Sequence, residues 1–148
     1  MIRPSRDAAF LNRVVNDPSV LPHVNLGLTG QLDMTPLVED QRNVFLANEW
    51  GGFLFIDKGE FVYEVHTQFL PEGRGKSAVR AARDAADYMF TMTDALRIDT
   101  YVQFDNPAAE WLSRATGFKK WGEVEYCGQP CNYYVLTLKN WARLRPCQ

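Results

Sequence analysis

The chain has few cysteines, no long hydrophobic run and almost no net charge, and each shortage excludes a class of protein. Three cysteines, Cys127, Cys131 and Cys147, do not make a disulfide framework, and we expect a reducing, cytoplasmic compartment. No apolar run approaches the roughly 20 residues that span a bilayer, and residues 1–7 lack the apolar core of a signal peptide. A net charge of −2 provides no bulk attraction to nucleic acid or to an anionic membrane.

What is present is the composition of a globular protein. Hydrophobic residues fill 46% of the 148 positions and charged residues 23%, which predicts a single domain with its own core. Cys127 and Cys131 have the spacing of a metal-binding pair, but no second Cys/His pair accompanies them. We therefore expect residues 127–131 to form a turn flanked by two cysteines, and we expect no metal.

Hydrophobic spacing predicts a mixed α/β sheet that is mostly antiparallel. Residues 7–16 have helical periodicity, and residues 17–40, with three prolines and two glycines, are expected to be loop with room for a short helical turn. We predict three strands joined by hairpin turns over 43–48, 52–57 and 61–69, followed by an alanine-rich helix over 77–93. A strand over 98–104 runs parallel to the third strand, because the helix connects them. A short helix over 106–118 and a final antiparallel pair of strands over 119–127 and 132–139 complete the prediction. A ligand is expected at the open end of the central parallel pair, which helices flank.

The turn between the third strand and the alanine-rich helix has the composition of a phosphate-binding loop. Its sequence is Pro71-Glu-Gly-Arg-Gly-Lys76, directly before the helix. A helix that begins there points free backbone N–H groups and the positive end of its dipole at the loop. Glycine suits the position because the backbone must approach a phosphate closely. A solvated turn without a ligand has the same pattern, so this loop does not decide the function alone.

Two segments together resemble the core of the GCN5-related N-acetyltransferases (GNAT), which transfer acyl groups from acyl-CoA to amines. The first is Phe69-Leu-Pro-Glu-Gly-Arg-Gly-Lys-Ser77, similar to the family's V-x-P-x-x-R-G-x-G, with Ser77 in place of a glycine and Val79 at the next small position. A second register, which begins at Glu72, keeps Gly75 and puts Ser77 at the last small position. The other segment runs from Asn106 to Phe118 and is similar to N-x-x-A-x-x-x-Y-x-x-x-G-F.

The resemblance covers roughly residues 44–140 and implies a set of CoA-binding residues. They lie in the loop, at the end of the preceding strand and before the short helix: Phe69, Arg74, Gly75, Lys76, Ser77, Ala78 and Asn106. The segment His66-Thr-Gln-Phe-Leu-Pro71 is also similar to phage-encoded and prophage-encoded acetyltransferases, which would place the chain in a bacterial host cell.

The resemblance also implies catalytic residues on the two parallel strands. Family members use a carboxylate or histidine there as the base, and the candidates are Glu64, His66 and Tyr101. Strand alternation puts Glu64 and His66 on one face unless a bulge intervenes. The usual proton donor for the thiolate is the motif's tyrosine, which is Ser113 here, so Tyr101 and Tyr126 are alternative donors.

The expected function is acetyl transfer from acetyl-CoA to a primary amine by direct attack, without a covalent enzyme intermediate. The acceptor, a small molecule or a peptide, stays open. A catalytically silent GNAT-fold protein with a binding or assembly role, phage-encoded or not, is the alternative, because Ser77, Val79 and Ser113 depart from the family pattern. A nucleotide-binding regulator has only the loop in its favour. An unpaired edge strand leaves a homodimer open.

Overall fold

The protein is described by a computed structural model that covers residues 1–24 and 30–145. Cys147 and part of the predicted loop over 17–40 lie outside the described residues. The elements are β1 (Arg3–Pro4), α1 (Ala8–Val15), α2 (Leu21–Val24), α3 (Thr35–Glu39), β2 (Val44–Asn48), β3 (Gly51–Asp57), β4 (Val62–Phe69), η1 (Pro71–Gly73), α4 (Lys76–Met92), β5 (Arg97–Gln103), α5 (Pro107–Thr116), β6 (Lys119–Tyr126), β7 (Gln129–Thr137) and α6 (Leu138–Leu144).

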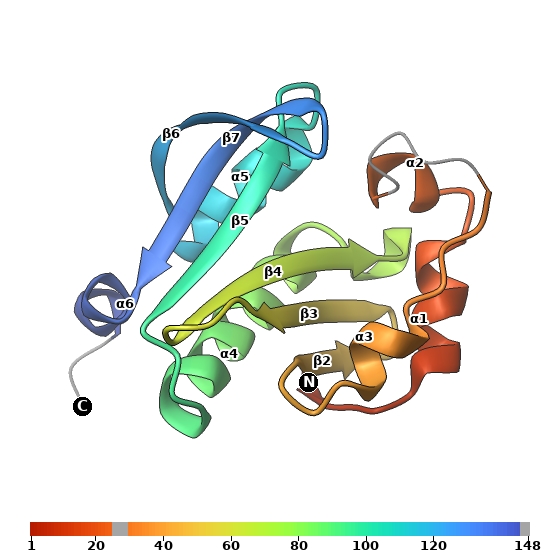
Figure 1. The fold of residues 1–148 in the computed structure, drawn as a ribbon, viewed down its shortest axis with the longest axis horizontal. Coiled ribbons are helices and arrows are strands. Elements are labelled where there is room, and N and C mark those ends of the chain that lie inside the picture. Colours follow the sequence, from red (N-terminus) through yellow and green to blue (C-terminus); the bar gives the residue numbers. More distant parts are fainter. Residues whose placement is uncertain (25–29, 146–148) are drawn as a thin grey trace.

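The strands form one mixed sheet in the order β1-β2-β3-β4-β5-β7-β6 (Figure 1). Neighbouring strands run antiparallel except β4 and β5, which run parallel because α4 carries the chain back between them. The predicted mostly antiparallel sheet with one central parallel pair is therefore confirmed.

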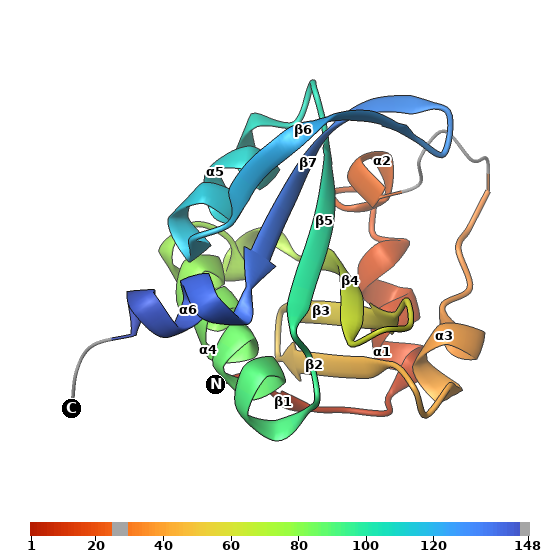
Figure 2. The ribbon, with the colours of Figure 1, turned by 60° about the vertical axis from the view of Figure 1, so that its left-hand side comes forward.

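Helices cover both faces of the sheet. Figure 2 shows α4, α5 and α6 on one side and α1 and α3 on the other. Alternating strand residues supply the two cores: Phe53, Phe55 and Val65 pack with the alanines of α4, whereas Phe45 and Leu54 pack with α1 and α3. The face covered by α4 and the face covered by α1 are called the α4 face and the α1 face below.

Three local features differ from the expectations. Strand β1 pairs with β2, although the sequence pattern did not indicate a strand at Arg3–Pro4. The predicted last strand ends at Thr137, whose hydroxyl accepts a hydrogen bond from the N–H of Asn140 and so caps α6. In the described parts of residues 17–40, 17–24 and 30–40, two short helices are present, α2 and α3, rather than one turn.

Candidate active site

The two parallel strands separate soon after they begin. Only three residue pairs join β4 to β5, the last being Glu64 with Asp99, and Figure 1 shows the ribbons diverging beyond it. The N–H of Leu70 donates to the carbonyl of Trp50, directly before β3. Backbone groups alternate in direction along a strand, so those of Thr67 and Phe69 face away from β3, toward the opening. We call this opening, between residues 65–69 and 100–103, the split.

The first turn of α4 lies directly after β4 and offers unpaired backbone donors. The first intrahelical bond is donated by Val79 to the carbonyl of Gly75, which leaves the N–H groups of residues 75–78 without an intrahelical acceptor. No side chain caps this end, and no acidic residue lies in the first turn. Gly75 has φ 72° and ψ −136°, a conformation that essentially only glycine adopts. This helix end can hold an anion.

Arg74 braces the loop. Its Nε donates to the carbonyl of Phe69 at 3.0 Å and its Nη2 to the carbonyl of Ser19 at 2.8 Å. Its own N–H donates to Pro71 within η1. The guanidinium thus ties the end of β4 to the segment between α1 and α2.

Asn106 begins α5. Its side-chain oxygen accepts a hydrogen bond from the N–H of Ala109 at 3.1 Å, and Gly117, with φ 104°, ends the helix. The Asn and Gly of the sequence motif are therefore the two caps of one helix.

A buried carboxylate organises the α1 face of the split. Glu64 Oε2 lies 2.6 Å from His66 Nε2 and 2.6 Å from the hydroxyl of Tyr126 (both contacts are hydrogen bonds). The Glu64 side chain is 5% exposed and that of His66 33% exposed. The register between β3 and β4 is continuous, so no bulge changes the predicted alternation, and Glu64 and His66 share a face.

Glu64 is ionised at neutral pH. Burial acts to raise its pKa, but the hydrogen bonds from His66 and Tyr126, with the charge of Lys58 at 3.8 Å, outweigh burial and lower the pKa. An ionised carboxylate only accepts hydrogen bonds, so Nε2 of His66 carries a proton. In a neutral imidazole the nitrogen free to accept a proton is then Nδ1.

Three tyrosines continue the cluster across the sheet. The ring of Tyr101 stacks on Tyr126 at 4.3 Å and on Tyr133 at 5.1 Å between centroids. Burial and the hydrogen bond to Glu64 raise the pKa of Tyr126, and burial and nearby carboxylates raise that of Tyr101. Both shifts oppose release of a proton from these hydroxyls.

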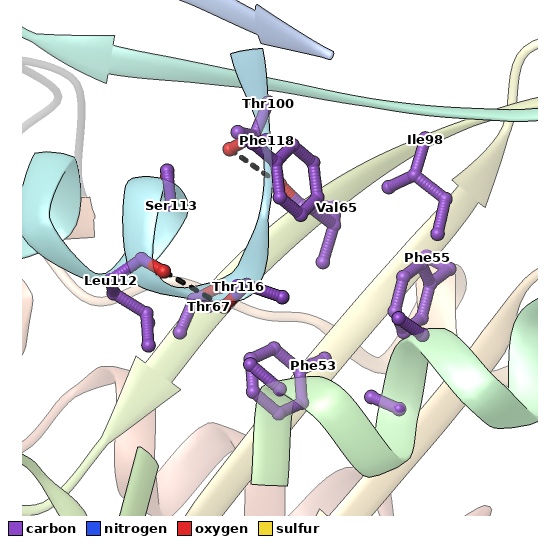
Figure 3. A pocket seen from close by; sticks show the side chains of 13 residues that line it. Phe53, Phe55, Val65, Thr67, Ile98, Thr100, Leu112, Ser113, Thr116 and Phe118 are labelled. Carbon is purple, nitrogen blue, oxygen red and sulfur yellow. Dashed lines mark hydrogen bonds between the residues drawn. The ribbon is translucent and has the colours of Figure 1, made fainter. Parts of the chain in front are cut away.

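Ser113 lies on the α4 face of the split, on α5. It is buried, and its hydroxyl donates to the carbonyl of Ala109 within its own helix at 3.0 Å. It lines a small pocket between the sheet, α4 and α5 (Figure 3). The split thus lies between an apolar pocket on one face and the Glu64–His66 pair on the other.

The structure brings the three predicted catalytic residues into one cluster and places the predicted loop at the end of β4. Tyr126 links to Glu64 from 62 positions along the chain, a contact that no spacing in the sequence indicates. Asp99, which accepts hydrogen bonds from Tyr133 and Arg97, is a buried residue of this face that the sequence patterns did not single out. The predicted turn between cysteines is a hairpin turn at Cys127-Gly128.

Within residues 1–24 and 30–145, no group of three His, Cys, Asp or Glu side chains could hold a metal ion. In the same ranges, no helix is long and apolar enough to span a membrane.

Solved structures share the whole fold. The chain superposes on the aminoglycoside acetyltransferase AAC(6')-Ib, solved with paromomycin and acetyl-CoA, with a TM-score of 0.80 and 17% identity, covering 100% of this chain and 98% of that one. It superposes on the spermidine N-acetyltransferase of Vibrio cholerae, solved with CoA and spermine, with a TM-score of 0.77 and 19% identity, covering 96% and 97%. No family model and no curated protein matches the sequence. The chain has the GNAT fold, as the sequence motifs predicted.

Proposed function

We propose that the protein is an N-acyltransferase that moves an acetyl group from acetyl-CoA to a primary amine. The observation that carries the proposal is the split between β4 and β5. The uncapped end of α4 and the apolar pocket lie on one face of the sheet at this opening, and the Glu64–His66 pair lies on the other. The structural neighbours named above, which act on amines and were solved with acetyl-CoA or CoA, support the same activity.

Backbone groups carry CoA binding in this proposal. The N–H groups of residues 75–78 bind the pyrophosphate, with Lys76 adding positive charge and Ser77 a hydroxyl. Arg74 positions the loop and Asn106 borders the cleft. The carbonyl of Phe69 is already bonded to Arg74, so the N–H groups of Thr67 and Phe69 and the carbonyl of Thr67 are the groups left for the pantetheine arm and the thioester oxygen.

The chemistry rests on His66. The amine nitrogen attacks the thioester carbonyl carbon, a C–N bond forms, the C–S bond breaks, and its electron pair stays on sulfur. His66 Nδ1 takes the proton that the amine loses, and a proton returned to sulfur completes amide and free CoA. Glu64 positions the imidazole and stabilises its charged form, and the stacked Tyr101 borders the acceptor approach.

Calorimetric titration with acetyl-CoA, with ATP as the control ligand, tests the proposal. We expect micromolar acetyl-CoA binding and none for ATP. Lys76→Glu should weaken acetyl-CoA binding about tenfold in low salt, because it puts negative charge beside the phosphates. Lys139→Glu, the same change on exposed α6, should leave the affinity unchanged. Equal effects of the two substitutions would remove the loop from CoA binding.

A catalytically silent binding module is the second candidate, and a specific observation favours it. The hydroxyl of Ser113, at the position of the family's proton donor, is bonded within its own helix, and the pKa of Tyr126 is raised. Acetyl-CoA binding without transfer to spermidine, kanamycin or lysine peptides would support this candidate, whereas release of CoA thiol with any of them establishes the enzyme.

A further inference from the structure

The pocket on the α4 face is lined almost entirely by hydrocarbon. Figure 3 shows the pocket from close by. Its lining comes from β3, β4, β5, α4, α5 and the residue before β6: Phe53, Phe55, Val65, Thr67, Ala82, Ala85, Ala86, Ile98, Thr100, Leu112, Ser113, Thr116 and Phe118. No charged side chain is among them. The pocket therefore offers no partner for a charged ligand group.

Most of its hydroxyl groups are already used. Thr100 donates to the carbonyl of Val65 at 3.4 Å, Ser113 to Ala109 at 3.0 Å and Thr116 to Leu112 at 2.8 Å. Each bond turns the O–H toward the backbone, so the polar lining has little capacity left for a ligand. A hydrocarbon group would lose no hydrogen bond by entering.

Small side chains on two facing helices leave this space open. Ala82, Ala85 and Ala86 are the α4 residues in the lining, and Ser113 stands on α5 where the resembled family carries a tyrosine. A tyrosine ring at this position would occupy part of the volume that Ser113 leaves open. The size of the pocket therefore follows from particular residues of this chain.

The pocket continues from the split itself. Val65 and Thr67 on β4 and Thr100 on β5 line it, and these residues flank the point where the strands diverge. Ile98 lines it on the side where β4 and β5 are still paired, and Phe55 lines it from β3, opposite Val65. A thioester held by the open backbone of Thr67 can point its acyl chain into this space.

We propose that the pocket is an acyl-chain site and that the preferred donors carry a short straight acyl group longer than acetyl, of the butyryl to hexanoyl class. The inference rests on the proposed acyl transfer and specifies its donor. The same C–S bond breaks and the same C–N bond forms whichever acyl group is carried.

Calorimetric dissociation constants for CoA, acetyl-CoA, butyryl-CoA and hexanoyl-CoA test this directly on the full chain. Each methylene buried in an apolar pocket should tighten binding about fourfold, so butyryl-CoA, with two more methylenes, should bind about 15-fold more tightly than acetyl-CoA. Acetyl-CoA binding with equal or weaker binding of the longer donors would overturn the acyl site and leave the proposed function standing. If none of the four binds, both proposals fail.

A variant that fills the pocket distinguishes binding in the acyl site from nonspecific hydrophobic binding of longer acyl chains. Ser113→Leu should abolish the advantage of butyryl-CoA over acetyl-CoA. Ala108→Leu, on the same helix with an exposed side chain outside the pocket, should keep it. An advantage that persists in Ser113→Leu would overturn the proposal. The wild-type series decides alone if Ser113→Leu does not fold.

Discussion

The ionisation of Glu64 links the candidate site to the stability of the protein. Its pKa is lowered in the fold because the hydrogen bonds from His66 and Tyr126 outweigh burial. A carboxyl group whose folded pKa is lowered contributes stability above its ordinary pKa of about 4.3, and this contribution is lost as the pH falls through the folded value. The protein should therefore lose stability on acidification below about pH 4, partly through this one group.

Tyr126→Phe tests this coupling. The substitution removes one donor to Glu64 and leaves the ring stack on Tyr101 in place. The folded pKa of Glu64 should rise, so acid unfolding should begin at higher pH, and the free energy of unfolding at pH 7 should fall by about 1.5–3 kcal/mol. Circular dichroism against pH and urea measures both. The control Tyr101→Phe leaves the Glu64 bonds intact; identical acid midpoints for the two variants would contradict the assignment.

His66→Ala should separate catalysis from CoA binding. The imidazole lies on the α1 face, whereas the groups assigned to CoA are backbone donors at the split and at α4. We expect turnover to fall by about 100-fold or more, with an unchanged acetyl-CoA dissociation constant.

The matched control is His23→Ala, which removes an exposed histidine on α2. Steady-state rates of CoA thiol release with a working amine, together with calorimetry, distinguish the outcomes. Turnover in His66→Ala equal to that of His23→Ala would remove His66 from the mechanism.

At the scale of elements, the junction of β4 and α4 depends on one glycine. Gly75→Ala should cost about 1–3 kcal/mol of stability, because alanine is strained at φ 72° even though the space around the position is open. Relief of that strain would displace the N–H groups that follow, so acetyl-CoA affinity should fall as well. Gly122→Ala, which also meets open space but without a positive φ, is the control. Thermal unfolding and calorimetry of both variants make the comparison; equal stabilities would contradict the strain.

The sequence predicted the elements whose signal is local. The helix over 77–93 matches α4 (Lys76–Met92), and the strand over 61–69 matches β4 (Val62–Phe69), because hydrophobic periodicity and a Gly-rich turn define both. The last strand was predicted too long because apolar residues continue into α6 past the Thr137 cap. β1 has only two residues, one of them a proline, and is too short for any periodic signal.

For the candidate site, the sequence predicted only which side chains of one strand share a face. Alternation along β4 placed Glu64 and His66 together, and that was confirmed. The bond from Tyr126 to Glu64 depends on the twist of the β6–β7 hairpin over the sheet, which Figure 2 shows and which sequence spacing does not encode. The hydrogen bond from the guanidinium of Arg74 to the carbonyl of Ser19 likewise depends on packing against a segment that is distant in the sequence.

At the scale of the whole molecule, one sheet holds both cores together. β2 and β3 contribute to the core under α4 and to the core under α1, so neither core can lose its strands alone. We therefore predict a single cooperative unfolding transition, with calorimetric and van't Hoff enthalpies in agreement.

Acetyl-CoA should raise the midpoint temperature of that single transition, so that both cores are stabilised together. A ligand at 100 times its dissociation constant adds about 2.7 kcal/mol to the native state, which for this size corresponds to roughly 5–10 °C. Because the proposed site uses β4, β5, α4 and α5, stabilisation there should reach both cores through the shared sheet. Differential scanning calorimetry with acetyl-CoA, and with ATP as the control, measures the shift. Two transitions, of which acetyl-CoA moves only one, would show that the cores are independent and that the split couples to only one of them.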